Sequence, residues 1–386
     1  MSKRYDVCAA VVSDLAFDAR VWKEARSLAG AGYRVALIGC RYDIDSPRRR
    51  TEDGIDVFEV SLGSRSAGVS VLARAGTLLR LSLQILRTRA RVYHAHNIHV
   101  GPQSWLAAKL RGARLVYDAH ELYGELHGGP LTRLAVRAER PLERLMATSS
   151  DAVVTTNDSR AAALAERYNP RRLVTLANVP ARRDEVVPLD PGYGEGRILL
   201  YQGGIYGAGR SFEETIRALP LLPEDVVFAI VGFGRDGDIA RLRTVAESLG
   251  VASRLRLLPP RPFDELVQTA AAATVGLVPI KATSLNNYLG DTNKLFEYLM
   301  AGIPVAASDL PEIRRVVEQG DPPVGEIFDP LDPASIAAAV ARVLENDERY
   351  AARRVEARRL ALAELNWEHE ERKLRSLYRD LTGAAA

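Results

Sequence analysis

The residues with the clearest chemical potential lie between positions 291 and 305, where a polar loop precedes an apolar helical pattern. The helix is expected to begin near Asn293 with Asp291 as its N-cap, because a short carboxylate can accept a hydrogen bond from a first-turn amide. The unpaired amides and dipole of a helix start attract anions, and Lys294 adds a full positive charge there. Glu297 follows one turn later on the same face, within reach of a neighbouring hydroxyl group. This spacing fits a sugar nucleotide, although an ordinary capped amphipathic helix explains it equally well.

A second candidate phosphate site opens the second half of the chain. A predicted strand there runs into a flexible loop with four glycines, Gly203, Gly204, Gly207 and Gly209. Arg210 follows them, and a helix is expected to begin near Ser211. A guanidinium in this position could fork onto phosphate oxygens, and Arg210 and Lys294 could both face one diphosphate. A tight turn with a solvated arginine is the alternative.

Gly232, Phe233 and Gly234 begin a literal G-x-G-x-x-G motif between a predicted strand and a predicted helix. A dinucleotide-binding fold would also place an acidic residue about twenty positions later, at the end of the next strand. The sequence at 255–260 contains no acid. Hydride transfer on NAD is therefore disfavoured, while the glycines still permit the backbone to approach a nucleotide closely.

The first half of the chain carries polar residues directly after its first predicted strand. Two carboxylates and an arginine, Asp14, Asp18 and Arg20, lie in that loop. In a parallel sheet such a loop faces the ligand cleft. The same residues could equally cap the helix that follows.

Histidines gather after the next strands of this half. Three of them, His94, His96 and His99, follow the fourth predicted strand. Metal binding is not expected, because their spacing runs into a loop and no carboxylate or cysteine completes the set. The next strand ends with Asp118, His120 and Glu121, and three polar groups at one strand end favour a functional role over a core histidine.

Short apolar runs alternate with helical periodicity along all 386 residues, which predicts parallel sheets covered by helices on both faces. The chain exceeds the length at which one core keeps growing, so two domains are expected. A stretch rich in Pro, Gly and acids at 181–196 predicts a linker. The predicted α/β domains are residues 1–185 and 190–366, two Rossmann-like, doubly wound units that face each other across a cleft. A last helix, 367–386, carries an apolar stripe that needs a partner.

Composition excludes several classes of protein. Hydrophobic residues make up 47% and charged residues 26%, as in soluble globular proteins, and a net charge of +3 is too weak to indicate nucleic acid. Cys8 and Cys40 lie in apolar runs and predict neither a disulfide framework nor a metal site. No run approaches the roughly 18 apolar residues of a membrane span, and the N-terminus lacks a signal-peptide pattern. A cytoplasmic location is therefore expected.

Arginines form two basic stripes on predicted helices. One comprises Arg133, Arg137, Arg140 and Arg144, and the other comprises Arg74, Arg80 and Arg87 on a leucine-rich helix. Pro141 is expected to bend or interrupt the first of these helices. A solvated, partly ion-paired surface is the usual meaning of such stripes. Peripheral contact with an anionic membrane, at its inner face, is the alternative.

Taken in order, these segments resemble a retaining glycosyltransferase of the GT-B fold, similar to family 4. The resemblance spans nearly the whole chain and includes the loop at 13–20, His94-Ala95-His96, the segment 117–122, the loop at 203–210 and residues 232–234. Its most specific part is Asn293-Lys294-Leu295-Phe296-Glu297-Tyr298, followed by Gly302-Ile303-Pro304-Val305.

The resemblance implies that the C-terminal domain holds a nucleotide-diphosphate sugar, the donor. Arg210 and Lys294 would bind the diphosphate and Glu297 the ribose hydroxyls, while the backbone of 258–261 would frame the base. The implied donor-binding set comprises Gly203, Gly204, Gly232, Phe233, Gly234, Asp291, Thr292, Asn293 and Glu297.

His120 matches the family's cleft histidine near the transferred sugar, and it would be catalytic together with Arg210 and Lys294. The implied cleft or acceptor-side residues are Asp14, Asp18, Arg20, His96 and Glu121. The last helix would cross back onto the N-terminal domain. The implied reaction transfers a sugar to an acceptor hydroxyl with retention of configuration, and it needs neither a metal nor another cofactor.

Two departures from the family pattern leave the donor sugar open. Leu289 stands where the family often has a glutamate that contacts the transferred sugar, and Gly204 stands where many relatives have a basic residue. Two other functions fit the same features: a GT-B sugar-nucleotide epimerase, or a non-catalytic nucleotide-sugar-binding protein. The joint presence of His120, Arg210, Lys294 and Glu297 argues against the non-catalytic protein.

Overall fold

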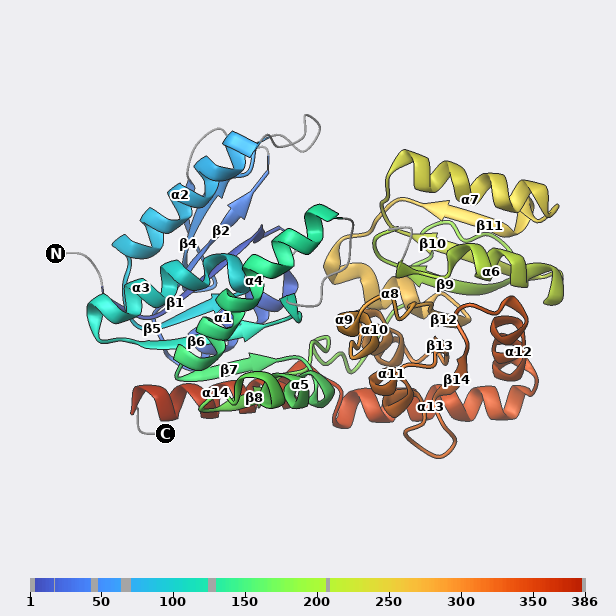
Figure 1. Cartoon of the computed structure of the whole chain (residues 1–386). Coiled ribbons are helices and arrows are strands. Elements are labelled where there is room, and N and C mark those ends of the chain that lie inside the picture. Colours follow the sequence, from blue (N-terminus) through green and yellow to red (C-terminus); the bar gives the residue numbers. More distant parts are fainter. Residues whose placement is uncertain are drawn as a thin grey trace. The chain divides into compact units, whose positions relative to one another are not determined.

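The computed structural model describes residues 4–16, 18–42, 48–63, 71–123, 130–205 and 209–383, except for the side chains of 71–74 and 130–138. Contacts within the chain divide it into two compact units. Unit 1 comprises Met1–Ala177 and Glu370–Ala386, and unit 2 comprises Asn178–His369. Each unit is an α/β domain with a mainly parallel sheet, as the sequence predicts (Figure 1).

Unit 1 contains an eight-stranded sheet in the order β3-β4-β2-β1-β5-β6-β7-β8. Its strands are β1 (Arg4–Asp14), β2 (Val35–Arg41), β3 (Arg48–Glu52), β4 (Ile55–Ser61), β5 (Arg89–His96), β6 (Arg114–Ala119), β7 (Ala152–Thr155) and β8 (Leu173–Thr175). All neighbours are parallel except β3, which pairs antiparallel with β4. The strand order reverses between β1 and β5, and ligands bind at such a switch point in doubly wound sheets.

The helices of unit 1 are α1 (Ala19–Gly30), α2 (Val71–Arg87), α3 (Gly101–Arg111), α4 (Pro130–Ser149), α5 (Asp158–Tyr168) and most of α14 (Trp367–Thr382). Helix α4 runs through Pro141, so the expected interruption there is wrong. Helix α14 joins unit 1 through buried side chains, among them Leu374, Leu377 and Tyr378. These residues form the apolar stripe that the sequence left without a partner.

Unit 2 contains a six-stranded parallel sheet in the order β11-β10-β9-β12-β13-β14. Its strands are β9 (Arg197–Gln202), β10 (Val226–Val231), β11 (Leu255–Leu258), β12 (Val275–Val278), β13 (Val305–Ser308) and β14 (Gly325–Phe328). Numbered within the unit, this is the 3-2-1-4-5-6 order of dinucleotide-binding folds, with its switch point between β9 and β12.

The helices of unit 2 are α6 (Phe212–Ala218), α7 (Asp236–Ser248), α8 (Leu266–Ala271), α9 (Leu285–Tyr288), α10 (Asn293–Ala301), α11 (Pro311–Val317), α12 (Pro333–Leu344) and α13 (Asp347–Ala363). The stretch at 181–196 has no regular secondary structure, but it packs on this unit. Tyr193 is buried there and donates to the carbonyl of Thr269 at 3.0 Å. The stretch that the sequence predicts as a linker thus belongs to unit 2, which begins at Asn178.

None of the helices in the described ranges is both long enough and apolar enough to cross a lipid bilayer.

Candidate active site

The first turn of α10 lies at the carboxyl edge of the unit 2 sheet and begins differently from the sequence expectation. The N-cap is Thr292, in extended conformation with φ −146° and ψ 139°, and its side chain makes no capping hydrogen bond. The prediction that Asp291 is the N-cap is therefore wrong. Helix α10 begins at Asn293, so the N-cap position directly before it belongs to Thr292. Without a capping bond from Thr292, the positive dipole end of α10 can attract an anion.

Lys294 stands in this first turn and meets the loop that follows β9. Its Nζ lies 3.0 Å from Thr292 Oγ1 and 5.1 Å from the centroid of the Tyr201 ring. A Cβ built on Gly203 would lie 3.5 Å from Lys294 Cε, so the glycine backbone lies directly beside this ammonium group. In the part of the chain that the structure describes, no carboxylate forms an ion pair with Lys294.

Glu297 lies one turn further along α10 and is anchored to the end of β9. Gln202 Nε2 donates to Glu297 Oε2 at 2.6 Å, and both side chains are buried. The next residue, Tyr298, also binds the end of β9. Its Oη donates to the carbonyl of Leu200 at 3.0 Å and accepts from the backbone N–H of Gln202 at 3.1 Å. These hydrogen bonds hold α10 against the end of β9 at the switch point, with Lys294 and Glu297 one turn apart on the helix.

Sequence reasoning missed Gln202. The available signal was a polar side chain at the last position of a buried strand, where Arg197–Gln202 otherwise reads Arg-Ile-Leu-Leu-Tyr. A buried amide requires a partner, and in a parallel sheet a strand end points towards the ligand edge. The partner itself, Glu297, could not be read from the sequence because 95 residues separate the two.

The glycine loops after β9 and β10 touch each other. The Ile205 amide donates to the Phe233 carbonyl at 2.8 Å, so the strand pairing continues into the loops. A Cβ on Gly232 would overlap the carbonyl oxygen of Gly203, and a Cβ on Gly234 would lie 2.7 Å from that of Ile205. Both glycines are therefore required by loop packing.

Arg210 lies at the far end of the β9–α6 loop, where it contacts the loop after β12 rather than α10. It forms a backbone bridge with Ile280, and its Nη1 donates to the Gly209 carbonyl at 2.9 Å. A cavity of about 140 Å³ adjoins it, lined also by Ile205, Phe212, Glu213, Glu214, Asp238, Arg241, Leu242 and Lys281.

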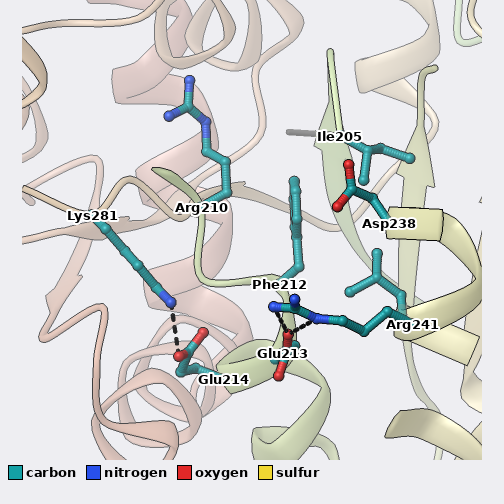
Figure 2. Close-up of a pocket in the computed structure, with 9 residues that line it drawn as sticks. Ile205, Arg210, Phe212, Glu213, Glu214, Asp238, Arg241 and Lys281 are labelled. Carbon is teal, nitrogen blue, oxygen red and sulfur yellow. Dashed lines mark hydrogen bonds and ion pairs between the residues drawn. The ribbon is translucent and has the colours of Figure 1, made fainter. Parts of the chain in front are cut away.

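The other cations of this cavity are neutralised. Lys281 pairs with Glu214 at 2.8 Å, and Arg241 pairs with Glu213. Figure 2 shows the Arg210 guanidinium pointing away from both glutamates. Among the described residues Arg210 has no ion-pair partner, and its Nε is buried without an acceptor. An anion could therefore bind Arg210 without first breaking an ion pair.

In unit 1 the polar residues converge on Asp118, at the end of β6. Arg20 binds both oxygens of this carboxylate, at 3.0 and 3.2 Å, and His96 Nδ1 lies 3.2 Å from Oδ2. His120 Nε2 lies 2.7 Å from the same oxygen. Burial by itself would raise the pKa of Asp118, but the Arg20 guanidinium and the two histidines hold that pKa well below its usual value. Asp118 is thus an ionised acceptor.

This carboxylate determines how His120 is presented. An ionised Asp118 only accepts, so the Nε2 of His120 carries a proton and donates to it. The other ring nitrogen, Nδ1, is then the one left for a ligand, and the His120 side chain is 24% exposed. The Arg160 guanidinium also binds the His120 carbonyl, which holds the backbone at this position.

The remaining predicted cleft residues of unit 1 divide into structural and exposed groups. Asp18 caps α1 by accepting from the Val21 amide at 3.3 Å, so the capping alternative is confirmed for it. Asp14 accepts from the Ala16 amide at 3.0 Å. Arg20 and His96 are buried around Asp118, and neither is presented to a ligand within this unit. Glu121 is exposed.

A buried extension of the cluster reaches α14. The rings of His94 and His96 stack with centroids 4.0 Å apart, and Tyr378 Oη lies 2.9 Å from His94 Nδ1. Glu24 Oε1 lies 3.1 Å from Arg20 Nε. Burial raises the pKa of Glu24 well above its usual value and lowers that of His94 well below its own.

The expectation that no carboxylate would complete the histidine set is wrong. Ligand atoms of Glu24, His94, His96 and Asp118 all lie within 4.8 Å of one another. However, the guanidinium of Arg20 contacts both carboxylates, at 3.1 and 3.0 Å. Arg20 thus already supplies a positive charge to both carboxylates of this cluster.

Comparison with known proteins finds one matching family model for each half of the chain. Residues 18–179 match the family model described as "Glycosyl transferase 4-like domain", and residues 196–346 match the one described as "Glycosyl transferases group 1". Fold and matched regions together define a glycosyltransferase of the GT-B class. Within that class, the chain belongs to the glycosyltransferases similar to family 4.

Individual proteins show the extent of the likeness. D-inositol 3-phosphate glycosyltransferase of Thermobispora bispora is 29% identical over 92% of this chain and 87% of its own length. Sucrose-phosphate synthase of Thermosynechococcus elongatus has the same fold, with a TM-score of 0.81 over the full length of both chains at 17% identity. Anabaena HepE, solved in complex with UDP and glucose, matches with a TM-score of 0.69 at 13% identity over 97% of this chain and all of its own.

Proposed function

We propose that this glycosyltransferase transfers a sugar from a nucleotide-diphosphate sugar to an acceptor hydroxyl, with retention of configuration and without a metal ion. The observation that carries the proposal is the start of α10. A helix N-terminus without a side-chain cap, a Lys294 ammonium with no ion-pair partner among the described residues, and the buried Glu297 carboxylate stand together at the switch point of unit 2. A nucleoside diphosphate needs an anion site for its phosphates and a hydrogen-bond acceptor for its ribose hydroxyls. The start of α10 with Lys294 offers the first, and Glu297 offers the second.

In this proposal the diphosphate binds at the first turn of α10, beside the Gly203 backbone. Lys294 offsets part of its charge there, and Arg210, which has no ion-pair partner among the described residues, supplies a second cation from the other end of the β9–α6 loop. Glu297, held by Gln202, accepts from the ribose hydroxyls. The other donor-binding residues are those of the two loops and the helix start, namely Gly204, Gly232, Phe233, Gly234, Asp291, Thr292 and Asn293.

The chemical step is bond exchange at the anomeric carbon. The bond from that carbon to the β-phosphate oxygen breaks, and a bond to the acceptor oxygen forms on the same face. The acceptor's proton passes to an oxygen of the departing diphosphate, so atoms and charges balance. Negative charge grows on that diphosphate in the transition state, where Lys294 and Arg210 stabilise it without reorganising. In this proposal they replace a divalent metal, and His120 contacts the transferred sugar through Nδ1.

The names of the relatives indicate which acceptor to test first. Several curated relatives, including that of Thermobispora bispora, are named D-inositol 3-phosphate glycosyltransferases. At 29% identity this name supports a phosphorylated polyol as the first acceptor to test. The membrane contact that the sequence leaves as an alternative concerns the arginine stripes of α2 and α4, where the side chains of Arg74, Arg133 and Arg137 lie outside the described residues.

A donor and acceptor panel tests the proposed reaction. The full chain is incubated with UDP-, GDP- and TDP-hexoses, with and without inositol phosphate or free inositol, and the products are examined by NMR. The expected result is an acceptor-dependent glycoside with the anomeric configuration of the donor, formed equally with EDTA present. An epimer from donor alone, an inverted product or loss of turnover in EDTA would each refute the proposal, as would donor binding with neither transfer nor hydrolysis.

The first prediction concerns the ammonium group at α10. Lys294→Ala should lower transfer by about 10²- to 10³-fold without unfolding the chain, because a preorganised charge contact in the transition state is lost. Lys281→Ala is the matched control, since Lys281 also lies at the carboxyl edge of this sheet but is neutralised by Glu214 at 2.8 Å. Steady-state rates at saturating donor provide the measurement. If both variants lose activity equally, Lys294 has no special role.

A further inference from the structure

The two neighbouring helices α2 and α3 of unit 1 form a surface with an unusual charge composition. Between Glu59 and Asp118 the chain contains no acidic residue, although 49 acids in 386 residues would place about seven among these 58 positions. The same interval contains nine arginines and lysines. This imbalance is local, because the chain as a whole has 52 basic and 49 acidic residues.

Leucines point outward from the same helices. Leu79 and Leu83 of α2 are 61% and 41% exposed, and Leu106 and Leu110 of α3 are 41% and 70% exposed. Each pair is spaced by four residues, so its members share one side of their helix. The opposite side of α2 is buried through Thr77, Leu81 and Ile85. The exposed leucines are therefore additional to those that the core requires.

The helices α2 and α3 pack against each other (Figure 1). Gln103 of α3 lies 3.2 Å from Ser82 Oγ, and the Arg111 guanidinium binds the Leu86 carbonyl. On α3, Leu106 and Leu110 lie three and seven positions after Gln103, on its side of the helix. On α2, Leu79 and Leu83 flank Ser82. The four leucines thus line the seam between the helices.

Three exposed cations lie on the same two helices as the leucines. Arg80, Arg87 and Lys109 are exposed. Within the described residues none of the three has a carboxylate within 4 Å, unlike Arg197, which pairs with Asp225, and Arg314, which pairs with Asp309. We call the four leucines and three cations the α2–α3 face. The positive charge of this face is therefore available to an anionic partner.

We propose that the α2–α3 face docks on an anionic lipid surface, with the leucines entering the interface and the three cations among the headgroups. Exposed leucines ringed by unpaired cations fit a surface that offers both hydrocarbon and negative charge. A nucleic acid offers phosphate, but its backbone offers no apolar surface for the four leucines. The occupant is thus an anionic bilayer, bound peripherally, and the proposal does not depend on the identity of the donor or acceptor.

Vesicle sedimentation of the full chain tests this assignment. The protein is expected to sediment with phosphatidylglycerol vesicles and not with phosphatidylcholine vesicles, and to be released by salt because surface charges are screened. Arg80→Gln with Arg87→Gln should weaken binding by about five-fold per cation removed. Leu79→Gln, Leu83→Gln and Leu110→Gln together should weaken it by at least about ten-fold.

Matched controls come from equally exposed positions in unit 2. Leu221→Gln with Val355→Gln removes apolar side chains that are 61% and 71% exposed, and Arg349→Gln removes an exposed cation. None of the controls should change sedimentation, and the face variants should keep the parent Tm and donor hydrolysis rate. Absence of binding to anionic vesicles, equal loss in the controls, or dimerisation in sedimentation velocity that the leucine variants abolish would overturn the proposal.

Discussion

At the scale of single residues, the site of unit 1 depends on one buried carboxylate. Asp118 is fully buried and contacts Arg20, His96 and His120, so it both neutralises the guanidinium and orients the ring that remains partly exposed. Sequence reasoning placed His120 and Asp118 together at a strand end. It could not find Arg20 as their partner, because 98 residues separate Arg20 from Asp118.

Breaking this buried pair from one side should destabilise unit 1 severely. Asp118→Asn or Arg20→Met leaves an uncompensated charge or acceptor in the core, and such changes cost about 3–5 kcal/mol of unfolding free energy. Urea unfolding followed by the fluorescence of Trp22 and Trp105, both in unit 1, measures the loss.

A double-mutant cycle separates the pair from general damage. Arg20→Met combined with Asp118→Asn should cost less than the sum of the two single changes, because no charge is then left alone. The exposed pair of Arg26 and Asp53, at 2.7 Å, is the control. Its removal should cost no more than about 1 kcal/mol. Additive effects at Arg20 and Asp118 would mean that the two side chains are not coupled.

At the scale of elements, the sequence predicted the apolar strands well and the irregular features poorly. The fully buried strands β7 and β10 coincide with short apolar runs of the sequence, and so does the partly buried β11. The edge strand β3, Arg-Arg-Arg-Thr-Glu, has no apolar pattern and exists only through its pairing with β4. The N-cap of α10 was predicted one residue too early, at Asp291 instead of Thr292. The sequence does not show whether a side chain at the N-cap position makes a capping hydrogen bond, and the side chain of Thr292 makes none.

Predictions about glycines also depend on neighbours that a sequence does not show. Gly232→Ala should destabilise unit 2 by about 1–3 kcal/mol and weaken donor binding, because the new Cβ would overlap the Gly203 carbonyl and force the two loops apart. Gly237→Ala is the control from the same motif. A Cβ there meets nothing within 4 Å, and alanine within α7 should stabilise by up to about 1 kcal/mol. Urea unfolding and donor titration measure both, and equal effects would contradict the packing argument.

At the scale of the whole molecule, titratable groups are distributed unevenly. Five of the six histidines belong to unit 1, and only His369 belongs to unit 2. Burial lowers the pKa of His94, His96 and His99. A lowered pKa in the folded state means that stability is complete above the unfolded value of about 6.5 and is lost as pH falls below it. Unit 1 should therefore be the acid-sensitive part of the chain.

Glu24 acts in the opposite sense on the same cluster. Its pKa is raised well above the usual value by burial, so the folded state takes up this proton more readily than the unfolded chain. Acidification towards about 4.5 therefore favours folding at Glu24 while it opposes folding at His94. Because the two terms offset each other, the slope of the parent protein alone cannot identify the histidine contribution.

The variant His94→Gln isolates that contribution. Its amide can still accept from Tyr378, but it cannot be protonated, so the variant should lose less stability than the parent between pH about 6.5 and about 5.5. One histidine that the folded state keeps neutral accounts for at most about 1.4 kcal/mol per pH unit. Calorimetry across this range, with unit 1 followed through Trp22 and Trp105, measures the slope, and His369→Gln in unit 2 should leave it unchanged. Parallel slopes for parent and His94→Gln would show that His94 does not contribute to the acid sensitivity of unit 1.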